Sequence, residues 1–364
     1  MDPVWDEGEW ADLPALTGAA EADICVVGLG GSGLAAVDEA LQAGASVIGL
    51  DAGSVAGGAA GANGGFLLAG AADAYHRTVA RLGRRAARDL YQRTLDELER
   101  MTTATPDLIR RVGSLRLAAS PEEETDCAEQ RRALEADQFA VERYEGPEGI
   151  GLLLPDDGAT NPLARARRLA QRALSGGARL FERSPATAVA GDHVTTPDGT
   201  VRCGAVVVAV DGRLELLLPE LAPRVRTARL QMLATAPTDE VTIPRPVYAR
   251  WGYDYWQQLP DGRIALGGCR DRFVDDEWTT DARPTDEVQA ALDALLREHL
   301  HVTAPVTHRW AASAGFARDL DPVLEEVRPR VFACGGYSGT GNVLGAVYGR
   351  DAVRRALGLH GAAS

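Results

Sequence analysis

The chain has 364 residues, which at roughly 150 residues per domain corresponds to about two domains. Hydrophobic residues make up 45% and charged residues 25%. These are ordinary globular values, so disorder, a collagen helix or a coiled coil is not expected as the main state. The formal net charge of −14 argues against non-specific nucleic-acid binding, which needs a basic face, and suits attraction of a cationic small molecule.

Neither a metal site nor an export signal is predicted. The five cysteines lack a CxxC pair and the six histidines lack metal-ligand spacing, so we expect no metal and no disulfide framework. Residues 1–22 are acidic and have no basic segment followed by an apolar one, unlike a signal peptide. No run of ~18 apolar residues could span a membrane. We therefore expect a cytoplasmic protein without a membrane partner.

The chain begins with a predicted β–α–β unit. Residues 23–27 form a short, β-branched apolar run that is typical of a buried parallel strand. Helical spacing follows over 32–43, and 46–51 is a second strand. A glycine- and alanine-rich loop covers 53–70, and then come predicted helices over 74–103, 122–139 and 163–175.

The pattern changes in the second half of the chain. After strand-like stretches at 180–190 and 201–210, alternating segments at 225–236, 247–259 and 263–269 predict an antiparallel sheet, and helical spacing covers 284–300. A buried strand at 331–334 precedes a final helix to about 357. We predict an α/β fold with an inserted α+β domain. A Rossmann-like nucleotide-binding domain would comprise 1–75, 145–220 and 305–364, and a mixed antiparallel-sheet substrate domain 76–144 and 221–304.

The strongest local signal is a dinucleotide fingerprint. The sequence from Gly28 to Gly33 has the form GxGxxG, directly after a strand and at the start of a helix. The glycines allow a tight turn, close approach of a pyrophosphate and close helix–strand packing, and the helix N-terminus favours phosphate. Asp51 ends the second strand, where a carboxylate accepts ribose hydroxyls and repels a 2′-phosphate. The motif leaves NAD and FAD open.

Glycine is in excess, with 40 residues, and 17 of them lie in three clusters. The first is the fingerprint, the second is the loop from Gly53 to Gly70, and the third is the stretch from Gly335 to Gly349. We interpret the excess as backbone that must approach a cofactor, against the alternative of flexible loops.

The three clusters, in this order, resemble the D-amino acid oxidase superfamily of FAD-dependent amine and amino-acid oxidoreductases. The similar branch is that of glycine oxidase and gamma-glutamylputrescine oxidoreductase. The segments that carry the resemblance cover nearly the whole chain: Trp10–Leu16, Gly58–Phe66, Gly151–Pro162, Arg309–Pro322 and Gly336–Gly341.

The resemblance implies FAD as cofactor. The flavin would be non-covalent, because the tethering cysteine of related enzymes is missing from 313–318. By position, the ADP part would contact Gly28, Gly30, Gly31, Ser32, Gly33, Asp51 and Ala52, with Val189 at the adenine side. The phosphates and the flavin ring would contact Gly58, Ala59, Ala60, Asn63, Gly64, Gly65 and Phe66. Val210 and Gly212 follow the last strand of that domain, and Gly339, Thr340, Gly341, Asn342 and Val343 would face the pyrimidine edge.

An aromatic cluster is the candidate substrate site. Five aromatic residues lie between Tyr248 and Trp256, and on a single strand Trp251, Tyr253 and Tyr255 would share one face. Such a wall can hold an apolar or cationic substrate over a flavin, although core packing explains it equally well. The predicted pocket and catalytic residues are Phe66, Tyr253, Tyr255 and Trp256.

The resemblance implies hydride transfer from the carbon beside an amine to flavin N5, followed by hydrolysis of the imine, with O₂ or another electron acceptor. The arginine that holds a carboxylate in glycine-oxidase-like members is replaced by Ala314, and 263–269 contain no lysine to speed the oxygen reaction. Two alternatives stay open. One is an NAD-dependent dehydrogenase, and the other is a degenerate flavoprotein without turnover, which the substitutions at Ala60, Ala62 and Thr340 favour.

Overall fold

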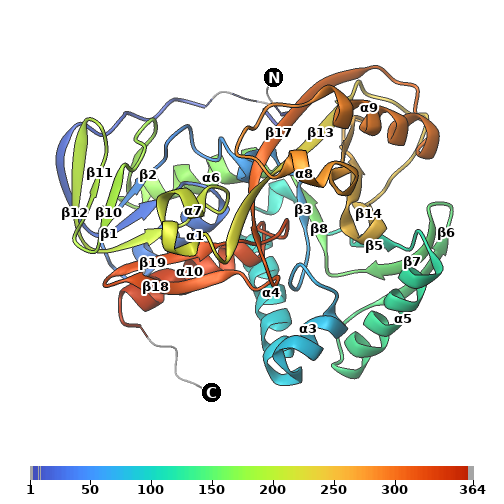
Figure 1. Ribbon diagram of the computed structural model, residues 1–364, viewed down its shortest axis with the longest axis horizontal. Coiled ribbons are helices and arrows are strands. Elements are labelled where there is room, and N and C mark those ends of the chain that lie inside the picture. Colours follow the sequence, from blue (N-terminus) through green and yellow to red (C-terminus); the bar gives the residue numbers. More distant parts are fainter. Residues whose placement is uncertain (1–2, 7, 9, 360–364) are drawn as a thin grey trace. The chain divides into compact units, whose positions relative to one another are not determined.

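The computed structural model describes residues 3–6, 8 and 10–359 (Figure 1). Parts of the segment analysed for a signal peptide, residues 1, 2, 7 and 9, lie outside the described residues, as does His360 of the six histidines. The chain forms two compact units. The parallel-sheet unit comprises 7–62, 162–228 and 313–364, and the antiparallel-sheet unit comprises 1–6, 63–161 and 229–312. The domain boundaries predicted from sequence, at 75, 145, 220 and 305, stay predictions.

The parallel-sheet unit is built on hydrophobic β-branched strands. Strands β1, β2, β9, β12 and β19 pair in parallel, and β10, β11 and β18 add antiparallel pairs. The carboxyl-terminal halves of β1 and β12 are fully buried, as expected for a sheet covered on both faces. The bounds are β1 (Gly18–Val27), β2 (Val47–Leu50), β9 (Arg179–Phe181), β10 (Ala188–Ala190), β11 (His193–Thr195), β12 (Gly199–Val208), β18 (Val323–Arg328) and β19 (Val331–Gly335).

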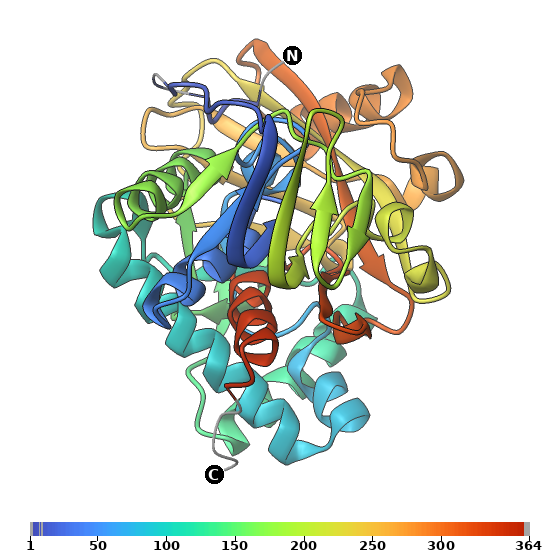
Figure 2. The ribbon, with the colours of Figure 1, turned by 90° about the vertical axis from the view of Figure 1, so that its left-hand side faces the viewer.

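Two helices of this unit pack closely against each other. Helix α10, red in Figure 2, contacts α1 and β19. A Cβ on Gly349 would lie 2.1 Å from the Ser32 carbonyl oxygen, and one on Gly345 would lie 2.7 Å from Ser32 Oγ. These two glycines therefore serve helix packing, which corrects the interpretation of the whole third cluster as cofactor-facing. The helices are α1 (Gly31–Gln42), α2 (Ala59–Ala62), α6 (Pro162–Ser175), α7 (Leu214–Leu217) and α10 (Leu344–Ala356).

The antiparallel-sheet unit holds an eight-stranded sheet in the order β17-β13-β16-β15-β14-β5-β7-β6 and a small sheet in the order β3-β8-β4. Strands β13 and β17 run between the two units along the chain. The bounds are β3 (Phe66–Leu67), β4 (Ile109–Arg110), β5 (Ser114–Leu117), β6 (Glu142–Gly146), β7 (Gly149–Leu154), β8 (Gly158–Thr160), β13 (Val225–Thr235), β14 (Val247–Ala249), β15 (Asp254–Gln258), β16 (Ile264–Gly267) and β17 (Val306–Ala317).

Helices of this unit match the predicted amphipathic segments. The stretch predicted as one or two helices is two, divided at Gly83. Helix α5 begins as the Ser120-Pro121 pair predicts, because Ser120 Oγ accepts a hydrogen bond from the Glu123 backbone N–H at 3.3 Å. The helices are α3 (Tyr75–Leu82), α4 (Arg84–Ala104), α5 (Pro121–Ala136), α8 (Val274–Glu277) and α9 (Asp286–Ala294), which continues as a π-helical turn over Leu295–His299.

One predicted strand is wrong. The segment 247–259 is a hairpin, β14 and β15, joined by a turn at Arg250–Gly252 rather than a single strand. Trp251 occupies that turn with a φ of +60° and is 47% exposed. Trp251, Tyr253 and Tyr255 therefore do not share one strand face, because period-two alternation does not continue through a turn.

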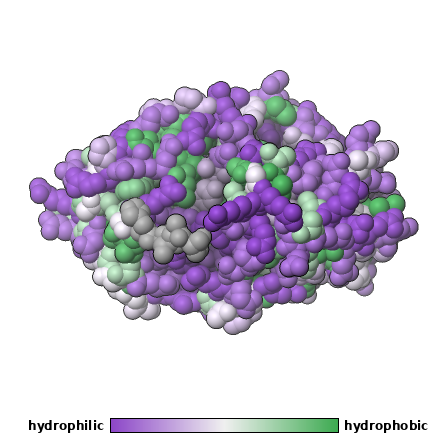
Figure 3. Space-filling view, turned by 90° about the horizontal axis from the view of Figure 1, so that it is seen from below, coloured by the Kyte–Doolittle hydropathy of each residue, from purple (hydrophilic) through white to green (hydrophobic). Residues whose placement is uncertain are grey.

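The surface seen in Figure 3 is covered mainly by hydrophilic residues, with hydrophobic ones in small groups. Within the described residues, no helix combines the length and hydrophobicity needed to cross a membrane.

Candidate functional site

The fingerprint loop between β1 and α1 depends on its glycines. Gly28 has a φ of +97°, and a Cβ there would lie 2.7 Å from the Ala209 carbonyl oxygen. A Cβ on Gly33 would lie 1.7 Å from the Gly28 carbonyl oxygen. Gly28 and Gly33 thus make the tight turn and the close helix–strand approach that the sequence predicts.

The N-terminus of α1 offers backbone donors. Gly30 is the N-cap residue without a side-chain cap, and the Leu34 N–H donates to the Gly30 carbonyl at 2.9 Å. The preceding N–H groups, of Gly31, Ser32 and Gly33, have no carbonyl one turn earlier in the helix. A Cβ on Gly31 would meet open space. This end of α1 therefore combines room with a positive dipole, which suits a phosphate.

Asp51 is fixed at the end of β2. Its carboxylate accepts hydrogen bonds from the backbone N–H groups of Leu29 at 2.8 Å and Gly53 at 2.9 Å. Burial raises the pKa of Asp51, and these two hydrogen bonds oppose the rise. Besides being the predicted ribose acceptor, Asp51 ties the fingerprint loop to the turn that begins with Ala52.

The second glycine cluster lies partly against the fingerprint. The Ala56 N–H donates to the Leu29 carbonyl at 3.1 Å, and a Cβ on Gly30 would lie 3.1 Å from the Ala60 Cβ. Ala59 and Ala60 form the short helix α2, and a Cβ on Gly58 would meet open space. Small residues at these positions keep the space beside the α1 N-terminus clear.

The C-terminal glycine loop is held by a carboxylate. Asp211 follows β12 and accepts hydrogen bonds from the N–H groups of Gly315 at 2.9 Å, Gly336 at 2.8 Å and Tyr337 at 3.1 Å. Burial raises the pKa of Asp211, and these three hydrogen bonds oppose the rise. Asp211 thus joins the chain after β12 to β17 and to the loop that follows β19.

The remaining predicted cofactor residues of this unit surround that carboxylate in sequence. Val210 Cγ1 would lie 2.9 Å from a Cβ on Gly28, and a Cβ on Gly212 would lie 2.4 Å from the Ser313 carbonyl oxygen. Val189 is buried on β10. The stretch from Gly339 to Val343 leads into α10, with Gly339 at a φ of +95° next to open space and Thr340 Oγ1 donating to the Tyr337 carbonyl at 2.9 Å. Gly341 and Asn342 lie within it.

The parallel-sheet unit therefore fits a dinucleotide. Gly31, Gly58 and Gly339 each face open space that a Cβ would enter, and the first lies at a helix N-terminus. A carboxylate ends the neighbouring strand β2. These are the groups that a pyrophosphate and a ribose need.

The rest of the second cluster belongs to the antiparallel-sheet unit. Asn63 Oδ1 accepts a hydrogen bond from the Gly65 N–H at 2.8 Å, and its carbonyl accepts one from Trp5 Nε1 at 2.7 Å. Gly65 has a φ of +73°, and a Cβ there would lie 2.3 Å from the Thr160 carbonyl oxygen. This turn leads into Phe66 at the start of β3.

Two of the predicted pocket residues meet here. The rings of Phe66 and Tyr255 lie edge to face with centroids 6.1 Å apart, and a Cβ on Gly64 would lie 3.2 Å from Tyr255 Cδ2. Both aromatic residues are half-buried. Burial, and then the charge of Asp254, raises the pKa of the Tyr255 hydroxyl well above its usual value, so this hydroxyl stays protonated.

The other two predicted pocket residues differ in burial. Tyr253 is half-buried at the end of the hairpin turn. Trp256 is 2% exposed and packs in the core cluster with Leu266 and Leu292, with its ring 5.6 Å from that of His299. Trp256 takes the opposite face of β15 from Tyr255, and its place in the core argues against direct contact with a substrate.

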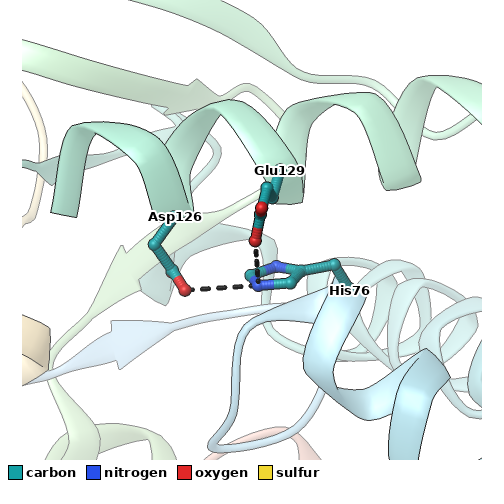
Figure 4. Close-up of side chains that lie close together, drawn as sticks. All are labelled: His76, Asp126 and Glu129. Carbon is teal, nitrogen blue, oxygen red and sulfur yellow. Dashed lines mark ion pairs between the residues drawn. The ribbon is translucent and has the colours of Figure 1, made fainter. Parts of the chain in front are cut away.

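One group of side chains among the described residues has metal-ligand geometry. His76 Nε2 on α3 lies 3.2 Å from Asp126 Oδ1 and 3.4 Å from Glu129 Oε2 on α5 (Figure 4). Asp126 also accepts hydrogen bonds from Arg77 and Arg116. Burial opposes them, but the two guanidinium groups hold the pKa of Asp126 below its usual range. These cations already compensate the carboxylate, so the arrangement works as an ion-pair network without a metal.

Sequence reasoning missed a second buried carboxylate. Glu182 is fully buried and accepts hydrogen bonds from Trp10 Nε1 at 2.9 Å and from the N–H groups of Leu13 at 2.8 Å and Val55 at 2.7 Å. It anchors the lead-in segment Trp10–Leu16 beside the second glycine cluster. A glutamate directly after a short apolar strand carries no periodicity signal of its own, so only the tertiary contacts identify it.

Comparisons with known proteins agree with this geometry. Residues 23–355 match the family described as DAO, FAD dependent oxidoreductase. The chain is 25% identical to gamma-glutamylputrescine oxidoreductase of Escherichia coli over 372 residues, which is 92% of this chain and 83% of that protein.

Solved structures share the fold. L-proline dehydrogenase from P. horikoshii superposes with a TM-score of 0.79 at 16% identity, covering 94% of this chain and 95% of that one. Glycine oxidase from Bacillus cereus superposes with a TM-score of 0.74 at 18% identity, covering 93% and 96%. The match to an FAD-dependent family removes the NAD-dependent alternative. The chain belongs to the DAO family of FAD-dependent oxidoreductases.

Proposed function

We propose that this protein oxidises the carbon–nitrogen bond of a small amine or amino acid. The observation that carries the proposal is the contact of Tyr255 with Gly64 and Phe66, because it joins an aromatic wall to the loop predicted to line the flavin ring. The names of similar proteins support it, since they act on gamma-glutamylputrescine, L-proline or glycine.

FAD, when bound, supplies a two-electron acceptor for hydride. The residues proposed to hold it non-covalently are those of the fingerprint, with Asp51 at the ribose and the N-terminus of α1 at the pyrophosphate. Phe66 and Tyr255 would position the substrate so that the carbon beside its nitrogen faces the ring. The substrate would lose a hydride from that carbon and a proton from nitrogen, and water would hydrolyse the imine to a carbonyl compound and ammonia or an amine.

Tyr255 is proposed as a wall and hydrogen-bond donor, not as a base. Its raised pKa keeps the hydroxyl protonated at neutral pH, so it cannot accept a proton there. The substrate must therefore bind as the neutral amine or lose its proton to solvent. Tyr253 would extend the wall.

The electron acceptor and the location are also proposals. No lysine lies between Arg263 and Cys269, which favours an acceptor other than O₂. The five cysteines are all free thiols, which supports a reducing, cytoplasmic location.

The test is the visible spectrum of the purified protein during anaerobic addition of an amine and amino-acid panel. We expect a yellow protein whose flavin is bleached by at least one member, and peroxide release on readmission of air distinguishes an oxidase from a dehydrogenase. A yellow protein that no member bleaches would instead support a flavoprotein without turnover.

The role of Tyr255 is tested by substitution. We expect Tyr255→Ala to lower turnover at least ~10-fold with flavin retained, because positioning contributes several kcal/mol to a barrier. Tyr255→Phe should keep most activity, since the ring remains and no base is lost. Trp251→Ala, in the exposed turn, is the matched aromatic control. Full activity of Tyr255→Ala would contradict the assignment.

A further inference from the structure

Arg270 lies between two aromatic rings on the antiparallel-sheet unit. It begins a short 3₁₀ turn, Arg270–Phe273, that follows β16. Its guanidinium carbon lies 5.0 Å from the ring centroid of Trp278 and 5.9 Å from that of Tyr253. All three residues are half-buried. Aromatic faces on this scale hold a guanidinium in one orientation while its N–H edge can still bind a planar anion.

The turn that presents Arg270 is held in an unfavourable backbone conformation. Cys269 has a φ of +60°, which residues other than glycine rarely adopt, and Gly268 has a φ of +148°. The Cys269 N–H donates to Asp254 Oδ1 at 2.9 Å, and a Cβ on Gly268 would lie 2.6 Å from the same oxygen. Asp254 is 1% exposed. Strain that the surroundings maintain in this way concentrates at functional sites.

The acidic side chains around this turn hold other cations. Glu277, which is buried, accepts hydrogen bonds from Arg229 at 2.6 Å and from Gln231 at 3.0 Å. Asp254 pairs with Arg250 at 2.8 Å, and Asp271 pairs with the same arginine. Burial lowers the pKa of Arg270, but a guanidinium stays charged at any physiological pH. A cation in a partly desolvated place attracts an anion more strongly than one in water.

This cation is close in the fold to the predicted flavin-side wall. Gly267, three residues before Arg270, pairs with Tyr255 across β15 and β16, and a Cβ on it would lie 2.5 Å from the Tyr255 ring. The other edge of that ring meets Gly64 and Phe66. One strand turn therefore links the aromatic wall to Arg270.

We propose that Arg270 binds the carboxylate of the substrate, so that the substrate class is amines that also carry a carboxylate. The inference rests on the proposed function for its meaning, because the carboxylate would orient the amine beside Tyr255. A guanidinium and a carboxylate form two parallel charge-assisted hydrogen bonds, which fix orientation as well as affinity. An amine without a carboxylate would lack this anchor.

The test measures binding rather than turnover. Benzoate is titrated into the flavin-loaded protein by calorimetry and by the change in visible flavin absorbance. We expect saturable binding that weakens about 10- to 100-fold in Arg270→Met, the range that loss of one charge-assisted contact gives. Arg270→Lys should restore only part of it, since an ammonium cannot form the two parallel bonds. Arg272→Met, exposed on the same turn, is the charge-matched control and should bind as the unaltered protein does.

The outcomes separate this inference from the proposed function. Benzoate binding that is absent, or equal in Arg270→Met and Arg272→Met with flavin retained, overturns the role of Arg270 whether or not amines bleach the flavin. Inorganic phosphate that competes as well as benzoate overturns the assignment to carboxylates. Where turnover exists, amino acids paired with their decarboxylated amines should show an Arg270-dependent rise in KM only for the carboxylate-bearing member.

Discussion

At the residue scale, Asp157 is the group whose protonation changes most on folding within reach of physiological pH. It is 2% exposed and accepts hydrogen bonds from the Ala69 N–H at 2.8 Å and from Ser114 Oγ at 2.6 Å. Burial outweighs these hydrogen bonds and raises the pKa of Asp157 from 3.8 to about 7. The folded protein therefore binds a proton more tightly than the unfolded chain between these two values.

This difference predicts how stability depends on pH. Because the folded state binds more protons, the free energy of unfolding falls as pH rises from about 4 to about 7. We expect Asp157→Asn, which can keep both hydrogen bonds, to remove about 3 kcal/mol of the loss between pH ~5 and pH ~8, measured by urea unfolding. Asp89→Asn, with a side chain 62% exposed, is the control. Equal pH slopes in the two variants would refute a raised pKa.

At the scale of elements, Asp211 shows how one side chain fixes several glycine-rich segments. A Cβ on Gly315 would lie 2.4 Å from the Asp211 carbonyl oxygen, and one on Gly335 would lie 3.1 Å from the Asp211 Cα. The glycines allow β17 and β19 to approach the chain after β12, and the carboxylate then accepts their backbone N–H groups. The loop predicted to face the flavin edge is thereby ordered before any cofactor binds.

The latch predicts a large effect of a single substitution. Asp211→Ala leaves three N–H groups without their acceptor, and we expect it to lower the free energy of unfolding by about 2–5 kcal/mol. Denaturant unfolding measures this loss, with Asp198→Ala in an exposed turn of the same unit as control. A loss similar to that of the control would mean that water replaces the carboxylate.

At the scale of the whole molecule, membership of an FAD-dependent family predicts that cofactor and stability are linked. A ligand that binds only the folded state at 100 times its Kd stabilises it by about 2.7 kcal/mol. We expect removal of FAD to lower the unfolding temperature by about 5–10 °C, at about 2–4 °C per kcal/mol. Differential scanning fluorimetry over a series of FAD concentrations checks this. A midpoint that does not move with FAD would contradict binding at the fingerprint.

Much of the fold follows from local sequence because its signals are local. The apolar run at 23–27, the fingerprint after it and Asp51 at the end of β2 each depend on residues within one β–α–β unit. The resemblance drawn from the glycine clusters is confirmed by the family match. The aromatic segment 247–259 failed because an exposed turn at Arg250–Gly252 carries the same residue types as a strand.

The sequence by itself determined the dinucleotide-binding element, the order of the glycine loops and the family. Only the tertiary structure decided which residues those loops depend on. It brought Asp211 to the N–H groups of Gly315 and Gly336, Glu182 to the lead-in segment, and Phe66 to Tyr255. It also assigned Gly345 and Gly349 to helix packing. The reason is physical: periodicity and turn chemistry act over a few residues, whereas a buried carboxylate or a close glycine contact joins segments about 100 or more residues apart.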